Sequence, residues 1–259
     1  MQPHHRARWL SPFLLLLLAG SSASAANLKA FRITPTHPAP RSQGPDAIAG
    51  IGDWFLGNGT LCAAISDPGH ESILSTRGGV LIDLSHCGAD NDEFNVLQPL
   101  FNFSREQVGD VHEIRSEVAE GEARIITRGE RHGVDFETRY SLDLQHPEQI
   151  RIHTRLERKR EGDRVFVFGD TVLHGSRQLA PFSLSTRDPG VSRGFHHPRI
   201  DVDQPIEMIR AIGPADLQVL VGDASADPGI AYGLWLRRAE LIEEDGTRTP
   251  LPFVAINGK

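Results

Sequence analysis

The stretch that decides the fold is V-D-F-E-T-R-Y-S-L, residues 134–142, in which every second side chain suits a buried face. Successive side chains of a strand point to opposite faces of a sheet, so this period of two predicts a half-buried strand. Residues 150–157, I-R-I-H-T-R-L-E, repeat the pattern after a short polar connection. Residues 165–168, V-F-V-F, are apolar throughout, which predicts a strand covered on both faces and placed centrally in its sheet.

The rest of the chain extends this β pattern, and helical periodicity is nearly absent. Asn58-Gly59 separates two apolar arms and predicts a hairpin over residues 54–65, and Asp245-Gly246 marks another turn. Gly78-Gly79 lets the backbone turn tightly into a buried strand. Further strands are predicted near residues 111–118, 122–128, 206–212, 217–221, 230–238 and 250–256. We therefore expect an all-β fold, a large antiparallel β-sandwich with little helix.

The first 25 residues have the pattern of a secretory signal. Arg6 and Arg8 precede an apolar run at residues 10–20, and Ala23-Ser24-Ala25 supplies the small residues of a cleavage site. The apolar run is shorter than the roughly 20 residues that a spanning helix requires. We expect a periplasmic or secreted protein with no membrane anchor after signal cleavage.

Composition divides the remaining chain and narrows its partners. Residues 26–50 are rich in proline and lack a sustained period, so they are interpreted as an extended arm or linker, and residues 51–259 as the β-sandwich domain. The formal net charge is −7 with no basic stripe, which disfavours nucleic acid as a partner.

Cys62 and Cys87 are the two cysteines of the chain. In an oxidising compartment such a pair is expected to form a disulfide, which would stabilise the fold by roughly 3 kcal/mol on the chain-entropy model. The alternative is two separately buried thiols, because cysteine also packs as a small hydrophobic residue.

Residues 85–95 read S-H-C-G-A-D-N-D-E-F-N and gather the side chains that most suggest a metal. His86, Asp90, Asp92 and Glu93 could supply nitrogen and oxygen ligands, but their spacing matches neither a calcium loop nor a tetrahedral zinc site. The segment is therefore interpreted as a solvated or hydrogen-bonded turn, with these four residues as weak metal candidates.

Motifs for nucleophilic or phosphate chemistry are missing from the sequence. There is no G-x-S-x-G and no G-x-x-x-x-G-K-[ST], and no cofactor is expected. Glu137, His153, Asp170 and His174 lie on or beside predicted strands and are the candidates for paired acid and base catalysis. The alternative is that these four belong to ordinary exposed polar faces of strands.

Several stretches resemble a β domain of exported bacterial proteins. G-D-W-F-L-G-N-G-T-L-C-A-A-I-S-D (52–67) and S-T-R-G-G-V-L-I-D-L (75–84), with D-N-D-E-F just beyond, resemble its start. V-D-F-E-T-R-Y-S-L-D-L (134–144), I-R-I-H-T-R-L-E-R (150–158) and V-F-V-F-G-D-T-V-L-H-G (165–175) resemble its middle.

This domain looks like the N-terminal partner of CehA/McbA-type metallohydrolases, whose catalytic PHP domain lies downstream, and it is similar to the galactose-mutarotase-like supersandwich. The resemblance covers about residues 50–235 and implies a supersandwich fold. The histidine and aspartate motifs of a PHP domain and the matched histidine and glutamate motifs of a mutarotase are not found in the sequence. The resemblance therefore assigns no catalytic or metal-binding residue.

Three hypotheses for the function follow. The leading one is an exported, non-catalytic β-sandwich module that binds carbohydrate or serves as an accessory domain to a downstream catalytic domain. The second is a sugar-active enzyme, mutarotase-like or lyase-like, that uses a carboxylate and histidine pair. The third is an N-terminal fragment of a metallohydrolase.

Overall fold

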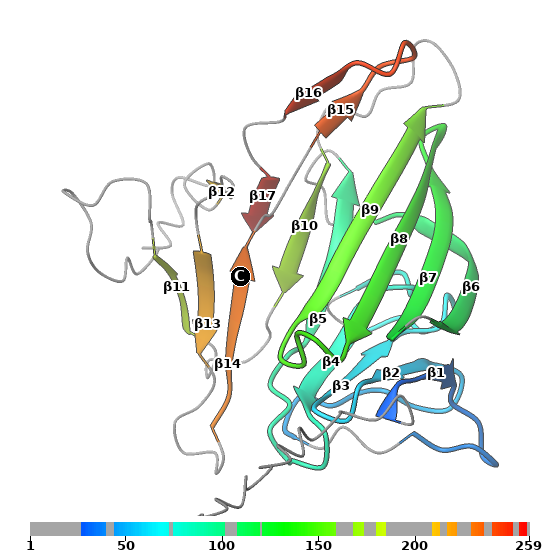
Figure 1. Ribbon diagram of the computed structural model, residues 1–259, viewed down its shortest axis with the longest axis vertical. Coiled ribbons are helices and arrows are strands. Elements are labelled where there is room, and N and C mark those ends of the chain that lie inside the picture. Colours follow the sequence, from blue (N-terminus) through cyan, green and yellow to red (C-terminus); the bar gives the residue numbers. More distant parts are fainter. Residues whose placement is uncertain are drawn as a thin grey trace, which may run out of the picture.

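The computed structural model describes residues 27–39, 44–72, 75–101, 108–119, 121–158, 168–173, 180–184, 209–212, 217–221, 229–235, 240–250 and 254–257. These residues form seventeen β-strands and no α-helix, which confirms the all-β prediction (Figure 1). None of the described residues forms a helix with the length and apolar character needed to cross a bilayer. The signal predicted at residues 1–25 lies outside the described part.

The larger sheet has six antiparallel strands. Its order is β1 (Lys29–Arg32), β2 (Trp54–Gly57), β3 (Leu61–Ile65), β4 (Leu81–His86), β5 (Val96–Phe101) and β10 (Phe168–Leu173). The first five follow chain order, and β10 returns to pair with β5. Of the central strand predicted at residues 165–168, only Phe168 lies within the described residues; it begins β10, which pairs with β5 and also contacts β17 (Val254–Asn257).

The smaller sheet is a four-stranded meander of long strands. It consists of β6 (Asp110–Ala119), β7 (Glu122–Arg131), β8 (Val134–Asp143) and β9 (Ile150–Arg158), paired in chain order. The strands predicted from the alternating pattern are therefore confirmed, including the dry and wet faces of β8. His132 and Gly133 join β7 to β8 with φ values of 52° and 79°, the left-handed conformations of a type I′ hairpin turn.

The remaining described strands are short. β11 (Ala180–Leu184), β13 (Leu217–Val221) and β14 (Ala231–Trp235) form one sheet, β12 (Ile209–Ile212) pairs with β17 (Val254–Asn257), and β15 (Glu240–Ile242) pairs with β16 (Arg248–Pro250). Gly246 has a φ of 84° in the turn between β15 and β16, which confirms the turn predicted at Asp245-Gly246.

The core lies between the six-stranded and four-stranded sheets, so the two sheets form a sandwich. Leu56 and Ile65 of the six-stranded sheet pack in one hydrophobic cluster with Ile125, Tyr140 and Leu142 of the four-stranded sheet. All five side chains are fully buried. Burial of apolar area on this scale is the main stabilising contribution to such a fold. Alternation along β7 and β8 places Ile125, Tyr140 and Leu142 on the inner face of the sheet and most of the charged side chains on the outer face.

A segment far along the chain completes this core. Ile230 and Tyr232 are buried in the same cluster, and the Tyr232 ring packs edge-on against Phe94 at a centroid distance of 5.3 Å. The Tyr232 hydroxyl donates to the carbonyl oxygen of Leu84 at 2.7 Å and accepts from the backbone N–H of Glu93 at 3.2 Å. The loop after β4 is therefore held by a residue that is distant in sequence.

The hairpin over residues 54–65 is confirmed, but its turn differs from the predicted one. Of Asn58 and Gly59, only Gly59 takes a positive φ, at 89°. Asn58 is buried, and its side-chain amide donates to the carbonyl oxygens of Asp143 and Pro147, both at 2.9 Å. Asn58 thus fastens this hairpin to the end of β8, a role that the tight-turn interpretation missed.

The disulfide between Cys62 and Cys87 is confirmed, with a Cα–Cα distance of 4.9 Å. It joins β3 to the turn that follows β4. Because β3 and β4 already pair, with Cys62 opposite Ser85, the bridge reinforces a local contact of the six-stranded sheet.

The proline-rich segment over residues 26–50 is fastened to the sandwich at both described ends. β1 pairs with β2, and the Phe31 ring stacks on His37 at a centroid distance of 3.9 Å. Farther along, Gly44 passes so close to the backbone of Asp92 that a Cβ on it would lie 2.2 Å from the Asp92 nitrogen. Glycine is therefore required at this crossing.

Candidate functional site

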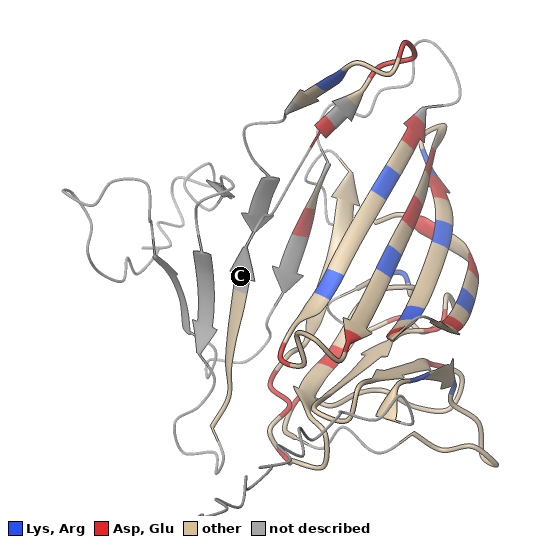
Figure 2. Ribbon diagram, in the orientation of Figure 1, with Lys and Arg blue, Asp and Glu red and all other residues tan. Residues whose placement is uncertain are grey.

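The four-stranded sheet carries many charged residues of both signs along its strands (Figure 2), and they alternate onto its outer face. We call this surface the charged face. Its ion-paired members are Arg115, Arg124, Arg128, Arg139, Arg151, Arg155, Glu113, Glu117, Glu122, Glu137, Asp143 and Glu157. Glu130 and Asp135, opposite each other on β7 and β8, point to the same face, so carboxylates outnumber arginines there.

Ion pairs link neighbouring strands of the charged face into a network. Arg151 of β9 contacts Glu122 of β7 at 2.9 Å and Asp143 of β8 at 2.6 Å. Ile126 also points to this face but is only 2% exposed, because it lies between Arg115 and Arg139 on the adjacent strands. The arginine stems therefore cover apolar surface while their guanidinium groups stay at the solvent.

Two of the predicted catalytic candidates lie on the charged face. Glu137 accepts hydrogen bonds from Arg128 at 2.8 Å and Arg139 at 2.7 Å. Partial burial acts to raise the pKa of Glu137, but these two arginines hold it below its usual value. His153 is exposed directly opposite Arg139, diagonal to Glu137. Glu137 is thus an ionised, arginine-bound carboxylate rather than a proton donor at neutral pH.

The other two predicted candidates are described only in part. Asp170 lies on β10, and its Oδ1 atom is buried without a hydrogen-bond partner among the described residues. Burial raises the pKa of Asp170 to about 6. His174 lies outside the described residues. Asp170 lies in the six-stranded sheet, whereas Glu137 and His153 lie in the four-stranded sheet.

The four metal candidates, His86 at the end of β4 and three carboxylates in the following loop, differ in burial. Asp90 is exposed, whereas Asp92 and Glu93 are fully buried, so the second half of the predicted turn is not solvated. Asp92 accepts a hydrogen bond from the backbone N–H of Phe94 at 2.9 Å, and His86 contacts Glu148 at 3.1 Å. Within the described ranges, no three histidine, cysteine, aspartate or glutamate side chains are grouped to hold a metal ion.

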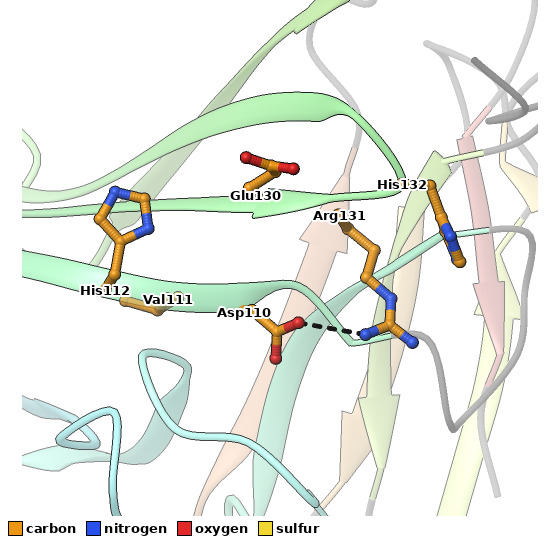
Figure 3. A pocket seen from close by; sticks show the side chains of 6 residues that line it. All are labelled: Asp110, Val111, His112, Glu130, Arg131 and His132. Carbon is orange, nitrogen blue, oxygen red and sulfur yellow. Dashed lines mark hydrogen bonds and ion pairs between the residues drawn. The ribbon is translucent and has the colours of Figure 1, made fainter. Parts of the chain in front are cut away.

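One hollow of about 480 Å³ lies beside the turn between β7 and β8 (Figure 3). It is lined by Asp110, Val111, His112, Glu130, Arg131 and His132. Figure 3 shows His112 and His132 at opposite ends of this hollow, with Arg131 bonded to Asp110 at 3.2 Å between them. The two imidazoles are therefore not arranged to act on one ligand atom.

A second hollow, of about 380 Å³, contains a carboxylate and histidine pair. Nδ1 of His70 lies 2.9 Å from both carboxylate oxygens of Asp53. The Asp53 side chain is 3% exposed and that of His70 is 28% exposed, so the carboxylate lies behind the imidazole. We call this site the Asp53–His70 hollow.

Two turns set the geometry of the Asp53–His70 hollow. Asp53 directly precedes β2, and its carboxylate accepts backbone N–H groups from Gly50 at 2.8 Å and Asp67 at 2.7 Å. Asp67-Pro68-Gly69-His70 forms a β-turn after β3, in which the His70 N–H donates to the Asp67 carbonyl oxygen at 2.8 Å. Arg32, at the end of β1, closes one side by donating to an Asp67 carboxylate oxygen at 2.9 Å.

Asp53 and His70 are not among the site residues that the sequence pattern predicts. A period of two in the sequence identifies the two faces of a strand. Asp53 and His70 lie outside the strands, in the turn before β2 and in the turn after β3. The signal that could have identified them is the pair of turn motifs G-I-G-D (50–53) and D-P-G-H (67–70) flanking one predicted hairpin. A hairpin brings its two outer ends together, so residues just outside both arms become neighbours.

No protein-family model matches the chain, and neither a curated protein nor a solved structure matches it. The resemblance to the N-terminal domain of CehA/McbA-type metallohydrolases therefore stays a prediction.

Proposed function

We propose that this chain is an exported β-sandwich module that binds carbohydrate, with the charged face of β6–β9 as its binding surface. The observation that carries the proposal is the network of ion-paired arginines and carboxylates across four neighbouring strands.

The network supplies what a hydroxyl-rich polymer requires. Each sugar hydroxyl both donates and accepts hydrogen bonds, and the face offers guanidinium donors beside carboxylate acceptors. Strands lie about 4.8 Å apart, so these groups repeat at a short, regular spacing. Because each charge already has a partner of opposite sign, the side chains are held in place before a ligand arrives, which lowers the entropic cost of binding.

The charge of this face also disfavours one class of partner, the polyanions. Because carboxylates outnumber arginines on this face, it does not attract a polyanion over long distances, unlike a basic stripe that binds nucleic acid. The binding role is favoured over catalysis at this face because Glu137 is bound by two arginines. Export is supported by the Cys62–Cys87 disulfide, since disulfides persist in oxidising compartments.

A glycan array followed by calorimetry on the strongest glycan tests the proposal. Arg139→Ala and Arg155→Ala, both on exposed parts of the charged face, are expected to weaken binding by roughly tenfold each, the cost of losing a charged hydrogen bond. Arg248→Ala is the matched control, because Arg248 is equally exposed and ion-paired but lies on β16. No bound glycan, or equal effects of all three substitutions, would refute the proposal.

A further inference from the structure

The hydrogen bonds around Asp53 fix where the hydrogen of the His70 ring lies. Each oxygen of the Asp53 carboxylate accepts one backbone N–H, from Gly50 or from Asp67. A carboxylate has no hydrogen to donate and can only accept hydrogen bonds. Nδ1 of His70, 2.9 Å from this carboxylate, must therefore be the nitrogen that carries the hydrogen. In the neutral ring, Nε2 is then left with a lone pair.

This lone pair belongs to a side chain that lines the hollow. His70 is partly exposed there, and Nε2 has no hydrogen-bond partner among the residues that the structure describes. A buried carboxylate that orients an accessible imidazole is an arrangement used to accept a proton from a hydroxyl group. The backbone bonds from the two turns hold the pair in place without a ligand.

The other lining groups indicate the charge of the ligand. Arg32 balances Asp67, and the Asp53 carboxylate remains when His70 is neutral, so an anionic ligand is disfavoured. Arg32 uses one N–H on the Gly52 carbonyl oxygen and one on Asp67, which leaves three of its five N–H groups for a ligand oxygen. Ile51, 73% exposed on the rim, adds an apolar contact.

We propose that the Asp53–His70 hollow is a second ligand site, which binds a neutral, hydroxyl-bearing molecule of about one sugar unit. His70 Nε2 accepts a hydrogen bond from a ligand hydroxyl, and Arg32 donates a hydrogen bond to a neighbouring ligand oxygen. The volume of about 380 Å³ is at the small end for ligand pockets, which suits a single sugar ring rather than a polymer. The site is separate from the charged face, and it does not depend on glycan binding there.

Nitrogen-15 NMR of the histidine rings in the purified protein tests the site directly. His70 is expected to show a protonated Nδ1 and an unprotonated Nε2, and the Nε2 signal is expected to move when methyl α-D-glucopyranoside or methyl β-D-galactopyranoside is added. Galacturonate, which carries a carboxylate, is expected to move it less at equal concentration. A hydrogen on Nε2 of the neutral ring, or no movement with either glycoside, would overturn the proposal.

Two substitutions separate this site from the charged face. His70→Gln is expected to weaken binding of the responding glycoside by roughly tenfold, while the matched His112→Gln in the other hollow leaves it unchanged. Arg139→Ala, by contrast, affects only binding at the charged face. Equal affinities of His70→Gln and His112→Gln would overturn the inference whatever the glycan array shows.

Asp53→Asn tests the orienting role of the carboxylate. The introduced amide can donate to Nδ1, so the ring hydrogen is expected to move to Nε2, with a matching exchange of the two nitrogen signals. If this buried substitution prevents folding, Arg32→Gln at the exposed rim provides the second test and is expected to weaken glycoside binding several-fold. Full affinity in folded Arg32→Gln would contradict the assigned ligand contacts.

Discussion

Asp83 is a buried aspartate whose ionisation depends strongly on its surroundings. It lies on β4 at 1% exposure, and its two oxygens accept the backbone N–H groups of Ile48 at 2.9 Å and Ala49 at 3.1 Å. Burial, and then the negative charge of Asp92, raise the pKa of Asp83 to about 7, although these two N–H groups act to lower it. Asp83 therefore fastens the proline-rich segment while binding a proton far more tightly than a free aspartate.

The sign of the resulting pH dependence follows from the raised pKa. The folded state binds the Asp83 proton more tightly than the unfolded chain, whose carboxyl has a pKa of 3.8, so this stabilisation is complete below about pH 4 and is lost as the pH rises to about 7. The free energy of unfolding is expected to fall by up to about 4 kcal/mol across that window. Asp170, with its pKa of about 6, acts in the same direction.

Urea unfolding at several pH values between 4.5 and 8 measures this slope. Asp83→Asn is expected to flatten it, whereas Asp90→Asn, at an exposed position of the following loop, is expected to keep it. Carboxylates with lowered pKa values, such as Glu122 and Asp143, lose their contribution only at lower pH and do not disturb the comparison. Equal slopes in the two variants would show that Asp83 is not the group responsible.

Among the elements, β3 and β4 are joined both by strand pairing and by the disulfide of the described chain. The Cys62–Cys87 bridge closes a sequence separation of 25 residues, which corresponds to roughly 3 kcal/mol on the chain-entropy model. Reduction is expected to lower the free energy of unfolding by about that amount. Urea unfolding with and without reductant measures it, and the double variant Cys62→Ala/Cys87→Ala should not respond to reductant. A wild-type protein equally stable after complete reduction would contradict the prediction.

The elements that the sequence predicts well are those with a clear period of two. β6 to β9 follow from alternation because each strand has one face on the core and one at the solvent. β5 carries Pro99, which removes a backbone donor and weakens the strand pattern, and β1 lies in a proline-rich segment. Both strands are determined by pairing with distant partners, which local pattern does not report.

The candidate sites divide in the same way. Alternation puts Glu137 and His153 at polar positions of two predicted strands, and the pairing of β8 with β9 brings these positions onto one face. The two cysteines identify the disulfide. Asp53 and His70 are 17 residues apart and meet because two turns and one hairpin bring them together. A local sequence pattern therefore does not predict their contact.

At the scale of the whole molecule, the two sheets depend on one shared core. Ile125→Ala removes a fully buried side chain between them and is expected to lower the free energy of unfolding by about 2–5 kcal/mol. Ile242→Ala, at a position 57% exposed, is expected to change it by no more than about 0.5 kcal/mol. Chemical denaturation of both variants makes the comparison. Similar effects would mean that the packing between the sheets contributes little.

The chain-order pairing of β1 to β5 and of β6 to β9 has a kinetic consequence. Each of these strands finds its partner in the segment synthesised just before it, so most loop closures are short and cost little entropy. The loop closures with the largest entropy loss are the pairing of β10 with β5 and the contact of Tyr232 with Leu84, which spans 148 residues. Until those late contacts form, the emerging chain carries two nearly complete sheets whose shared interior is still open at one side.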